Sequence, residues 1–215
     1  MEFDYIIDKI NDAKIVRKPW PYATMNDFLK PEHLELLKND WHSIDWTEHE
    51  DKKKEYVRSH EEPNWVRDYF SSQKSKQLTE FLSSKDIYDA MEKKFATTID
   101  WNDIFIKRMY KRDDAFAVDE SHTDVHCGVN SYMVLQVFFP DKSYNEFGTV
   151  LQEYFDQPIE ESIELPLIVN SANIFVNTPD TWHTTKPGDR LRKSYIQRFV
   201  FKEGHEPESF DHYNK

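Results

Sequence analysis

Short strand-like segments fill the second half of this chain, and this pattern limits the possible folds more than any other feature. From residue 100 onward, apolar and β-branched residues recur in short runs that are typical of strands. Turn-forming residues such as Asn177-Thr178-Pro179-Asp180 separate the runs. Many short strands joined by turns favour a β-sandwich or barrel of the jelly-roll type. We expect strands at 104–111, 132–139, 149–153, 165–168, 173–176, 182–185 and 191–202.

The first half of the chain has a helical pattern. Apolar residues recur at helical spacing over 31–41, 72–82 and 86–95, and serines stand at the expected starts of the last two helices. Residues 1–20 fit a short helix or a strand. The run 48–62 is highly charged, which is typical of a solvated loop or a short helix. The wider region 44–65 is long enough to form a mobile lid.

Helices followed by many strands predict an α+β chain with a mainly β core. At 215 residues the chain is long enough for one well-packed domain and short for two. We therefore expect a single domain over 1–215. It would consist of a helix-rich support region at 1–99, a jelly-roll core at 100–202 and a tail at 203–215.

Composition argues against several classes of function. The single cysteine rules out an intrachain disulfide framework and fits a reducing compartment. The net charge of −12 weighs against a nucleic-acid partner. The basic stretch 107–112 would divide its charges between two faces of a strand. No segment approaches membrane-spanning length, and acids interrupt the apolar residues at the N-terminus. We expect a cytoplasmic protein with no nucleic-acid or membrane partner.

Three short stretches carry residues that suit metal chemistry. They are His122-Thr123-Asp124, His183 and Arg192-Lys193-Ser194. A spacing of two places His122 and Asp124 on one face of a strand. Two imidazoles and one carboxylate are the ligand set that holds non-haem Fe(II) while leaving coordination positions open. An arginine and a hydroxyl can bind the far carboxylate of a small dicarboxylate.

Strand alternation relates the arginine to its neighbours. Within 191–202, one face of the strand carries Arg192, Ser194, Ile196 and Arg198. If Arg192 points into a barrel, Ser194 does so as well. Arg190 is a local competitor for the same role. The turn residues at 186–189 further suggest that 182–185 and 191–202 form a hairpin.

Other histidines also match short metal-like patterns. A His-x-Asp match arises about once by chance in a chain of this composition, and His49-Glu50-Asp51 is a second example. His33 and His60 begin His-x-Glu matches. His33 lies in a helical stretch, where a spacing of two separates the side chains. His49 and His60 lie in the charged run, so none of the three has the strand context of His122.

Two residues close to the motif are alternative ligands. His126 follows His122 by four residues, and we interpret it as a neighbour of the site or a surface residue. Cys127 offers a soft ligand, but the chain has no second cysteine, which argues against a zinc–thiolate site.

The five residues His122, Asp124, His183, Arg192 and Ser194 resemble the signature of the Fe(II)/2-oxoglutarate-dependent oxygenases, closest to the prolyl-4-hydroxylase-like branch. The resemblance extends over residues 100–202. It implies a double-stranded β-helix, a form of jelly roll, supported by N-terminal helices. It also implies that His122, Asp124 and His183 bind the metal, and that Arg192 and Ser194 bind 2-oxoglutarate.

Three further positions bear on this resemblance. Tyr110 precedes His122 by twelve residues, like the strand tyrosine that many relatives place near 2-oxoglutarate. Gly148-Thr149-Val150-Leu151 resembles the Gly-Gly-x-Leu strand of the prolyl hydroxylases. Phe138 departs from the pattern, because several relatives carry a tyrosine hydroxyl near this position.

The resemblance implies an enzyme that uses Fe(II), 2-oxoglutarate and O₂. It would hydroxylate a C–H bond and release succinate and CO₂, with no catalytic protein group beyond the metal ligands. The substrate stays open between peptidyl proline and a small molecule, and the oligomeric state is also open. The alternative is a jelly-roll or cupin-like binding module without enzymatic activity, in which the histidines are incidental.

Overall fold

The computed structural model describes residues 2–44, 53–55, 70–97, 106–113, 121–123, 132–186 and 191–200. Its helices lie mostly in the first half of the chain, as the sequence predicts. The helices are α1 (Tyr5–Asp12), α2 (Pro31–Ser43), α3 (Gln73–Leu82), α4 (Lys85–Phe95) and the short 3-10 helix η3 (Ile159–Glu161).

Local sequence explains where these helices begin. Pro31 occupies the first position of α2, where a missing N–H costs nothing. At α3, the Ser72 hydroxyl accepts a hydrogen bond from the Ser75 amide at 3.0 Å. The Ser75 hydroxyl in turn accepts one from the Ser72 amide at 3.3 Å, which completes a capping box. These bonds satisfy amides that the helix itself leaves without partners.

A seven-stranded antiparallel sheet forms the larger layer of the β core, in the order β1-β2-β8-β5-β10-β4-β3. It brings together strands from both halves of the chain. Its strands are β1 (Ile15–Val16), β2 (Tyr22–Met25), β3 (Lys53–Glu55), β4 (Ile106–Asp113), β5 (Tyr132–Phe138), β8 (Ser171–Asn177) and β10 (Leu191–Val200).

A three-stranded antiparallel sheet forms the smaller layer, in the order β7-β6-β9. Its strands are β6 (Tyr144–Leu151), β7 (Ile163–Leu167) and β9 (His183–Thr185). Residues of β6 and β7 approach closely at Gly148, where an added Cβ would lie 2.2 Å from the Leu165 carbonyl oxygen. A glycine is therefore needed at this position of the strand resembling Gly-Gly-x-Leu.

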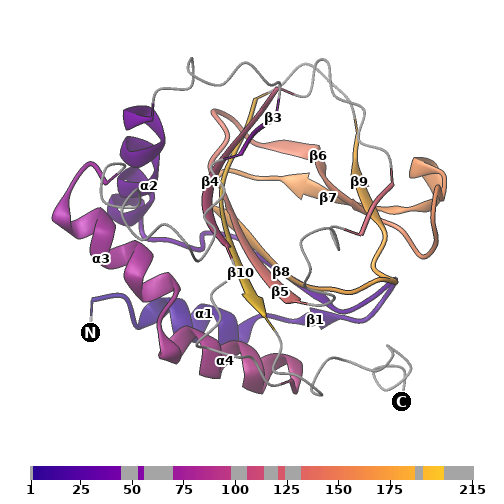
Figure 1. The fold of residues 1–215 in the computed structure, drawn as a ribbon, viewed down its shortest axis with the longest axis horizontal. Helices are drawn as coiled ribbons and strands as arrows, with labels where there is room; N and C mark the ends of the chain where they lie inside the picture. Colours follow the sequence, from indigo (N-terminus) through magenta and orange to yellow (C-terminus); the bar gives the residue numbers. More distant parts are fainter. Residues whose placement is uncertain are drawn as a thin grey trace.

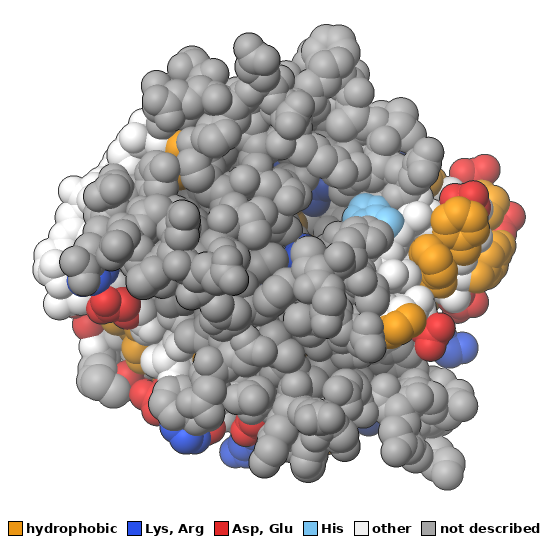
Figure 2. All heavy atoms as spheres, in the orientation of Figure 1, with side chains coloured by type: hydrophobic (Ala, Val, Ile, Leu, Met, Phe, Trp, Pro, Cys, Tyr) orange, Lys and Arg blue, Asp and Glu red, His pale blue; other side chains and the backbone are white. Residues whose placement is uncertain are grey.

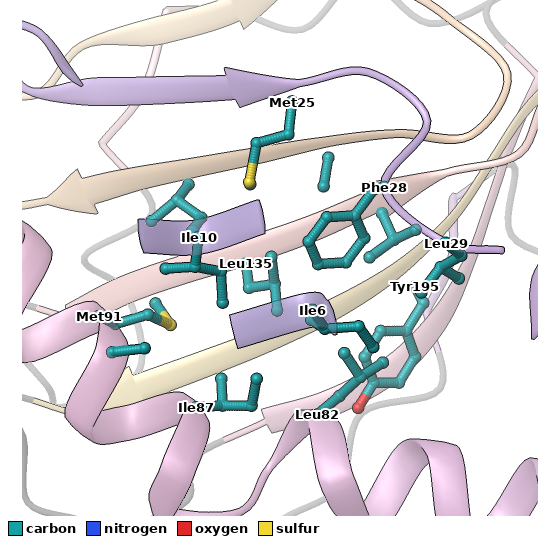
Figure 3. Close-up of a cluster of buried hydrophobic side chains, with 14 of the residues drawn as sticks. Ile6, Ile10, Met25, Phe28, Leu29, Leu82, Ile87, Met91, Leu135 and Tyr195 are labelled. Atoms are coloured by element: carbon teal, nitrogen blue, oxygen red, sulfur yellow. The ribbon is translucent and has the colours of Figure 1, made fainter. Parts of the chain in front are cut away.

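The helices and the smaller sheet cover opposite faces of the larger sheet (Figure 1). On the helix side, Ile6 and Ile10 of α1 and Met91 of α4 pack with Leu135 and Tyr195 of the sheet (Figure 3). On the other face, a second buried cluster lies between the two sheets. Its members are Trp20, Tyr22, Val134, Leu151, Leu165, Phe175 and Ile196. We call the face of the larger sheet that carries Val134, Phe175 and Ile196 the inner face.

This architecture confirms the predicted α+β class with a mainly β core, a jelly roll and N-terminal helices. Most of the expected strands form within two or three residues of their predicted bounds. Strand β6 begins at Tyr144, earlier than the predicted 149. The expected single-domain organisation stays a prediction, and the tail at 203–215 lies outside the described residues.

Two expectations about local structure are wrong. Residues 182–185 and 191–202 do not form a hairpin, because β9 pairs with β6 in the smaller sheet while β10 pairs with β4 and β5 in the larger one. The connection thus crosses between layers. The charged run 48–62 is not only loop or helix, because β3 at 53–55 pairs with β4. The remainder of the proposed lid, 45–52 and 56–65, lies outside the described residues.

Within the described residues, no helix is both long enough and apolar enough to cross a lipid bilayer.

Candidate metal and cosubstrate site

His122 and His183 face each other as a cross-strand pair. The His122 amide donates to the His183 carbonyl at 3.0 Å, and the His183 amide donates to the His122 carbonyl at 2.9 Å. Residues paired in this way project their side chains from the same face. Accordingly, their imidazole centroids lie 4.6 Å apart. Because His183 also pairs with Leu151 of β6, His122 extends the smaller sheet at its β9 edge.

The ring of His183 is held in a defined orientation. Its Nδ1 lies 3.1 Å from the Thr181 carbonyl oxygen. A carbonyl can only accept, so this hydrogen bond requires the proton on Nδ1 and leaves the Nε2 lone pair for another partner. The Thr181 hydroxyl donates at 2.8 Å to Asn177 Oδ1, which fixes the turn before β9. This is the arrangement in which a histidine binds a metal through Nε2.

Gln152 ties together the chain segments that carry the two histidines. Its backbone amide donates to the Trp182 carbonyl at 2.9 Å, one residue before His183. Its side-chain Oε1 accepts from the Ser121 hydroxyl at 2.8 Å, one residue before His122. The side chain is only 2% exposed. Its Nε2 donates to the Gln157 carbonyl at 2.6 Å, so both ends of the amide are satisfied.

The third predicted ligand, Asp124, lies outside the described residues, and so do His126, Cys127 and Arg190. Within the described part of the chain, no three His, Cys, Asp or Glu side chains converge to form a metal site. The structure therefore brings together two of the three predicted ligands.

The His33 match has a structural role in the described chain. It lies in α2, where the sequence predicts a helix, and the structure shows that it is buried there. Tyr5 Oη lies 2.8 Å from its Nδ1, and Glu2 Oε1 lies 3.2 Å from its Nε2. His49 and His60 lie outside the described residues.

Arg192 and Ser194 lie on the inner face of β10, as alternation predicts. They share this face with Ile196, which belongs to the cluster between the sheets. Both side chains are buried. The guanidinium carbon of Arg192 lies 5.7 Å from the centre of the Phe138 ring. Phe138 pairs with Ser194 in the register, so the ring that the guanidinium approaches belongs to the residue opposite Ser194.

Tyr110 and Phe138 lie on the two strands that flank β10, and each pairs with Ser194. Tyr110 of β4 pairs with Ser194 on one side of β10, and Phe138 of β5 pairs with it on the other. Phe138 brings an aromatic ring without a hydroxyl to this row. The Ser194 hydroxyl instead accepts a hydrogen bond at 3.1 Å from Nε2 of Gln136.

The sequence analysis did not single out three buried polar residues of the inner face as candidates for the site. They are Gln136 of β5, Asn173 of β8 and Arg198 of β10, all buried. Gln136 and Asn173 each stand between two apolar residues of a buried strand. Burying a polar side chain in such a run costs free energy unless its polar atoms form hydrogen bonds. The pattern is visible in the sequence.

Exposed aromatic side chains follow β6, and one of them contacts the residue that precedes His183. Tyr154 and Phe155, which follow β6, are 51% and 54% exposed. The Phe155 ring packs edge-on against Trp182 at 4.9 Å between centroids, next in sequence to His183. Figure 2 shows histidine atoms in pale blue on this face, with hydrophobic side chains to their right and basic atoms nearer the centre.

Solved structures of hydroxylases resemble this chain. A prolyl-4-hydroxylase from Pseudomonas putida matches with a TM-score of 0.57 and 10% sequence identity, over 94% of this chain and 100% of that one. A prolyl 4-hydroxylase from Phytophthora capsici matches with a TM-score of 0.60 and 10% identity, over 95% and 64% of the two chains. A Trichoplax adhaerens prolyl hydroxylase, in complex with a hypoxia inducible factor peptide fragment, matches with a TM-score of 0.57 and 9% identity, over 93% and 91%.

No protein-family model matches the sequence, and a search of curated proteins found no match. The structural likeness, at about one identical residue in ten, establishes the fold. The expected resemblance to the prolyl-4-hydroxylase-like branch is confirmed at this level: the chain has the double-stranded β-helix fold of these hydroxylases.

Proposed function

We propose that this protein is an Fe(II)- and 2-oxoglutarate-dependent dioxygenase that hydroxylates a C–H bond of a peptidyl proline or a small molecule. The observation that carries the proposal is the paired placement of His122 and His183, with their imidazoles 4.6 Å apart inside the fold of the hydroxylases. The two histidines are separated by more than a quarter of the chain, and packing alone does not require their imidazoles to lie together. A metal ion bound by both would account for the pairing.

The described donors fit ferrous iron. The hydrogen bond from the His183 Nδ1 to the Thr181 carbonyl selects the tautomer that has its lone pair on Nε2, the form in which a histidine binds a metal. His122 lies on the same face, and the Asp124 carboxylate, two residues along, would complete the facial set of two histidines and one carboxylate. Gln152 would hold the two histidine-bearing segments at a fixed separation.

Arg192 and Ser194 would bind the far carboxylate of 2-oxoglutarate. A guanidinium can donate two parallel hydrogen bonds to a carboxylate, and Ser194 can add a third from its hydroxyl. Gln136 supports this arrangement, because its Nε2 donates to the Ser194 oxygen and so directs the hydroxyl proton elsewhere. Tyr110, which pairs with Ser194 in the register, is a further candidate for this subsite.

The bound iron and 2-oxoglutarate would supply the oxidative chemistry, in which O₂ is reduced, 2-oxoglutarate yields succinate and CO₂, and a C–H bond becomes C–OH. The residues of this chain would contribute binding and orientation. Buried apolar side chains between the sheets, Val134, Phe175 and Ile196 among them, would keep water away from the reacting atoms. No protein general base is required.

Substrate-independent turnover and metal binding test the proposal together. The purified protein, supplied with Fe(II), 2-oxoglutarate, ascorbate and O₂, should form succinate slowly. Under anaerobic conditions the same mixture should give the visible charge-transfer band of the iron–keto acid chelate. His183→Ala should abolish both signals. His42→Ala is the matched control, because His42 is an exposed histidine in the last turn of α2, and it should retain both.

Two results would count against the proposed function. If the wild-type protein gives neither band nor succinate, the binding-module alternative gains support. If His183→Ala retains the band, the iron is held elsewhere.

A further inference from the structure

Arg198 is a second buried arginine on the inner face of β10. It lies six residues after Arg192, so the two Cα atoms are about 20 Å apart along the strand. Arg198 is 5% exposed, and alternation with Ile196 directs it to the space between the sheets. A dicarboxylate held by Arg192 at one end of this strand has no need of a second arginine at the other.

The strand register places Arg198 in the same row of the inner face as Phe175, whose ring lies near that of His183. Arg198 pairs with Val134, and Val134 pairs with Phe175 on the next strand. The Phe175 ring in turn lies 6.0 Å from the His183 ring, between centroids. Arg198 therefore belongs to the row of inner-face residues that leads to the proposed metal, whereas Arg192 belongs to a row further down the sheet.

Asn173 presents an additional donor close to this row. It lies on the same inner face of β8 as Phe175, two residues earlier, and is 3% exposed. Among the described residues, no acceptor lies within hydrogen-bond reach of its Nδ2. A buried N–H group without an acceptor is costly, which points to a ligand oxygen at this position.

The donors of this row suit a ligand that supplies acceptor oxygens. The guanidinium of Arg198 and the amide N–H₂ group of Asn173 can only donate hydrogen bonds. A guanidinium can donate two parallel hydrogen bonds to a carboxylate, so a carboxylate is the best-matched partner for Arg198.

We propose that the primary substrate carries a carboxylate, which Arg198 binds next to the metal while Asn173 donates to an oxygen of the same molecule. This inference rests on the function proposed above and deepens it. It favours a small organic acid, such as a free amino acid, over a residue inside a polypeptide, because an internal peptidyl residue has no backbone carboxylate. Arg198 would act as a specificity-determining residue.

Matched acids and amides test this inference. Free L-amino acids and short carboxylic acids are supplied singly to the Fe(II)- and 2-oxoglutarate-loaded enzyme, each beside its primary amide and beside a prolyl peptide blocked at both ends. At least one acid should accelerate succinate formation above the substrate-independent rate. Its amide should need a concentration at least about tenfold higher for the same effect, since it lacks the charge that pairs with the guanidinium.

Binding is measured separately from turnover. The protein is loaded with redox-inert Zn(II) and N-oxalylglycine, an unreactive analogue of 2-oxoglutarate, and titrated calorimetrically with the active acid. Arg198→Met should weaken acid binding by about ten- to a hundredfold and remove the preference over the amide. Arg198→Lys should restore part of both, and Asn173→Leu should weaken binding of acid and amide alike. Lys142→Met, at an exposed lysine, is the control and should bind normally.

The outcomes separate this inference from the proposed function. If the protein forms no iron–2-oxoglutarate chelate, the function itself fails. If substrate-independent succinate formation runs but no acid accelerates it, or if the amide or the peptide acts equally well, the anionic substrate is wrong. If Arg198→Met and Arg198→Lys change only the 2-oxoglutarate requirement, Arg198 belongs to the cosubstrate subsite and the inference is overturned.

Discussion

The side-chain oxygen of Gln152 accepts a hydrogen bond at 2.8 Å from the hydroxyl of Ser121, the residue immediately before His122. Through its backbone amide, the same glutamine binds the carbonyl of Trp182, immediately before His183. One buried residue at the end of β6 thus contacts both histidine-bearing segments. The scaffold thus sets the relative position of the two imidazoles, so little rearrangement would be needed for the proposed metal to bind.

Replacing Gln152 should weaken metal binding. Gln152→Met keeps the volume but loses both the acceptor for Ser121 and the donor to Gln157. Partners that orient metal ligands typically matter by about ten- to a hundredfold in affinity, and we expect a loss near the lower end because Gln152 acts through neighbouring residues. Gln152→Glu, which keeps the acceptor, should lose less. Calorimetric titration with Fe(II) or Zn(II) measures the effect.

A control distinguishes positioning from general destabilisation. Ser83→Ala removes a buried hydroxyl that donates to the Thr79 carbonyl at 2.9 Å, on the helix side of the molecule. It should lower thermal stability without changing metal affinity. Equal metal affinity for Gln152→Met and the wild type, with only stability reduced, would mean that Gln152 has a structural role alone.

Replacing Arg192 should raise the 2-oxoglutarate requirement. Arg192→Ala removes the guanidinium that shares the inner face of β10 with Ser194, so the half-saturating concentration of 2-oxoglutarate should rise by about ten- to a hundredfold. Arg192→Lys should recover only part, because an ammonium cannot form the bidentate contact. Steady-state kinetics and calorimetry on the Fe(II) protein give the two measurements. Unchanged 2-oxoglutarate affinity in the alanine variant would refute the assignment.

Substituting Gly148 should destabilise the smaller sheet. A Cβ at this position would lie 2.2 Å from the Leu165 carbonyl oxygen, and a backbone atom cannot rotate away as a side chain can. Gly148→Ala should therefore lower the free energy of unfolding by about 1–3 kcal/mol, the usual cost of overpacking. Urea denaturation measures this. A variant as stable as the wild type would show that β6 and β7 can separate without cost.

Asp40 should make the protein less stable as the pH rises. Burial raises the pKa of this carboxyl above its ordinary value, against hydrogen bonds from the Ser71 amide and hydroxyl at 2.6 and 2.7 Å. The native state then binds the Asp40 proton more tightly than the unfolded chain does. Its contribution to stability is fully present below the unfolded pKa of about 3.9 and is lost as the pH rises through the higher native pKa.

Asp40→Asn tests this linkage. The asparagine oxygen can still accept from Ser71, but the group no longer titrates. The unfolding free energy of the variant, relative to that of the wild type, should increase between about pH 4 and pH 7. Urea denaturation at several pH values gives this difference. A difference that is constant with pH, or that decreases, would contradict the raised pKa.

Strand alternation in the sequence correctly predicted which residues share a face, and it could do so because the period of two is strict. Arg192, Ser194 and Ile196 lie together on the inner face of β10 as expected. The helices could also be predicted from the sequence, because serine caps and helical spacing are local signals. Ser72, at the cap of α3, is an example.

Which strands pair with each other in the sheets could not be predicted from local signals. The turn at 186–189 suggested a hairpin, yet β9 and β10 belong to different sheets. A turn sequence specifies a change of direction but not the strand that each flank joins. For the same reason, the row that links Arg198 to Val134 and Phe175 depends on pairing between distant segments. The charged strand β3 was missed because its pairing with β4 outweighs its low β-propensity.

Anomalous diffraction at the iron edge tests the central claim most directly, on crystals of the full-length protein grown anaerobically with Fe(II) and 2-oxoglutarate. We predict one strong peak, at coordination distance from the imidazoles of His122 and His183 and from the carboxylate of Asp124. Arg192 should bind the far carboxylate of 2-oxoglutarate. A peak at any other site, or an Asp124 carboxylate directed away from the two imidazoles, would contradict it.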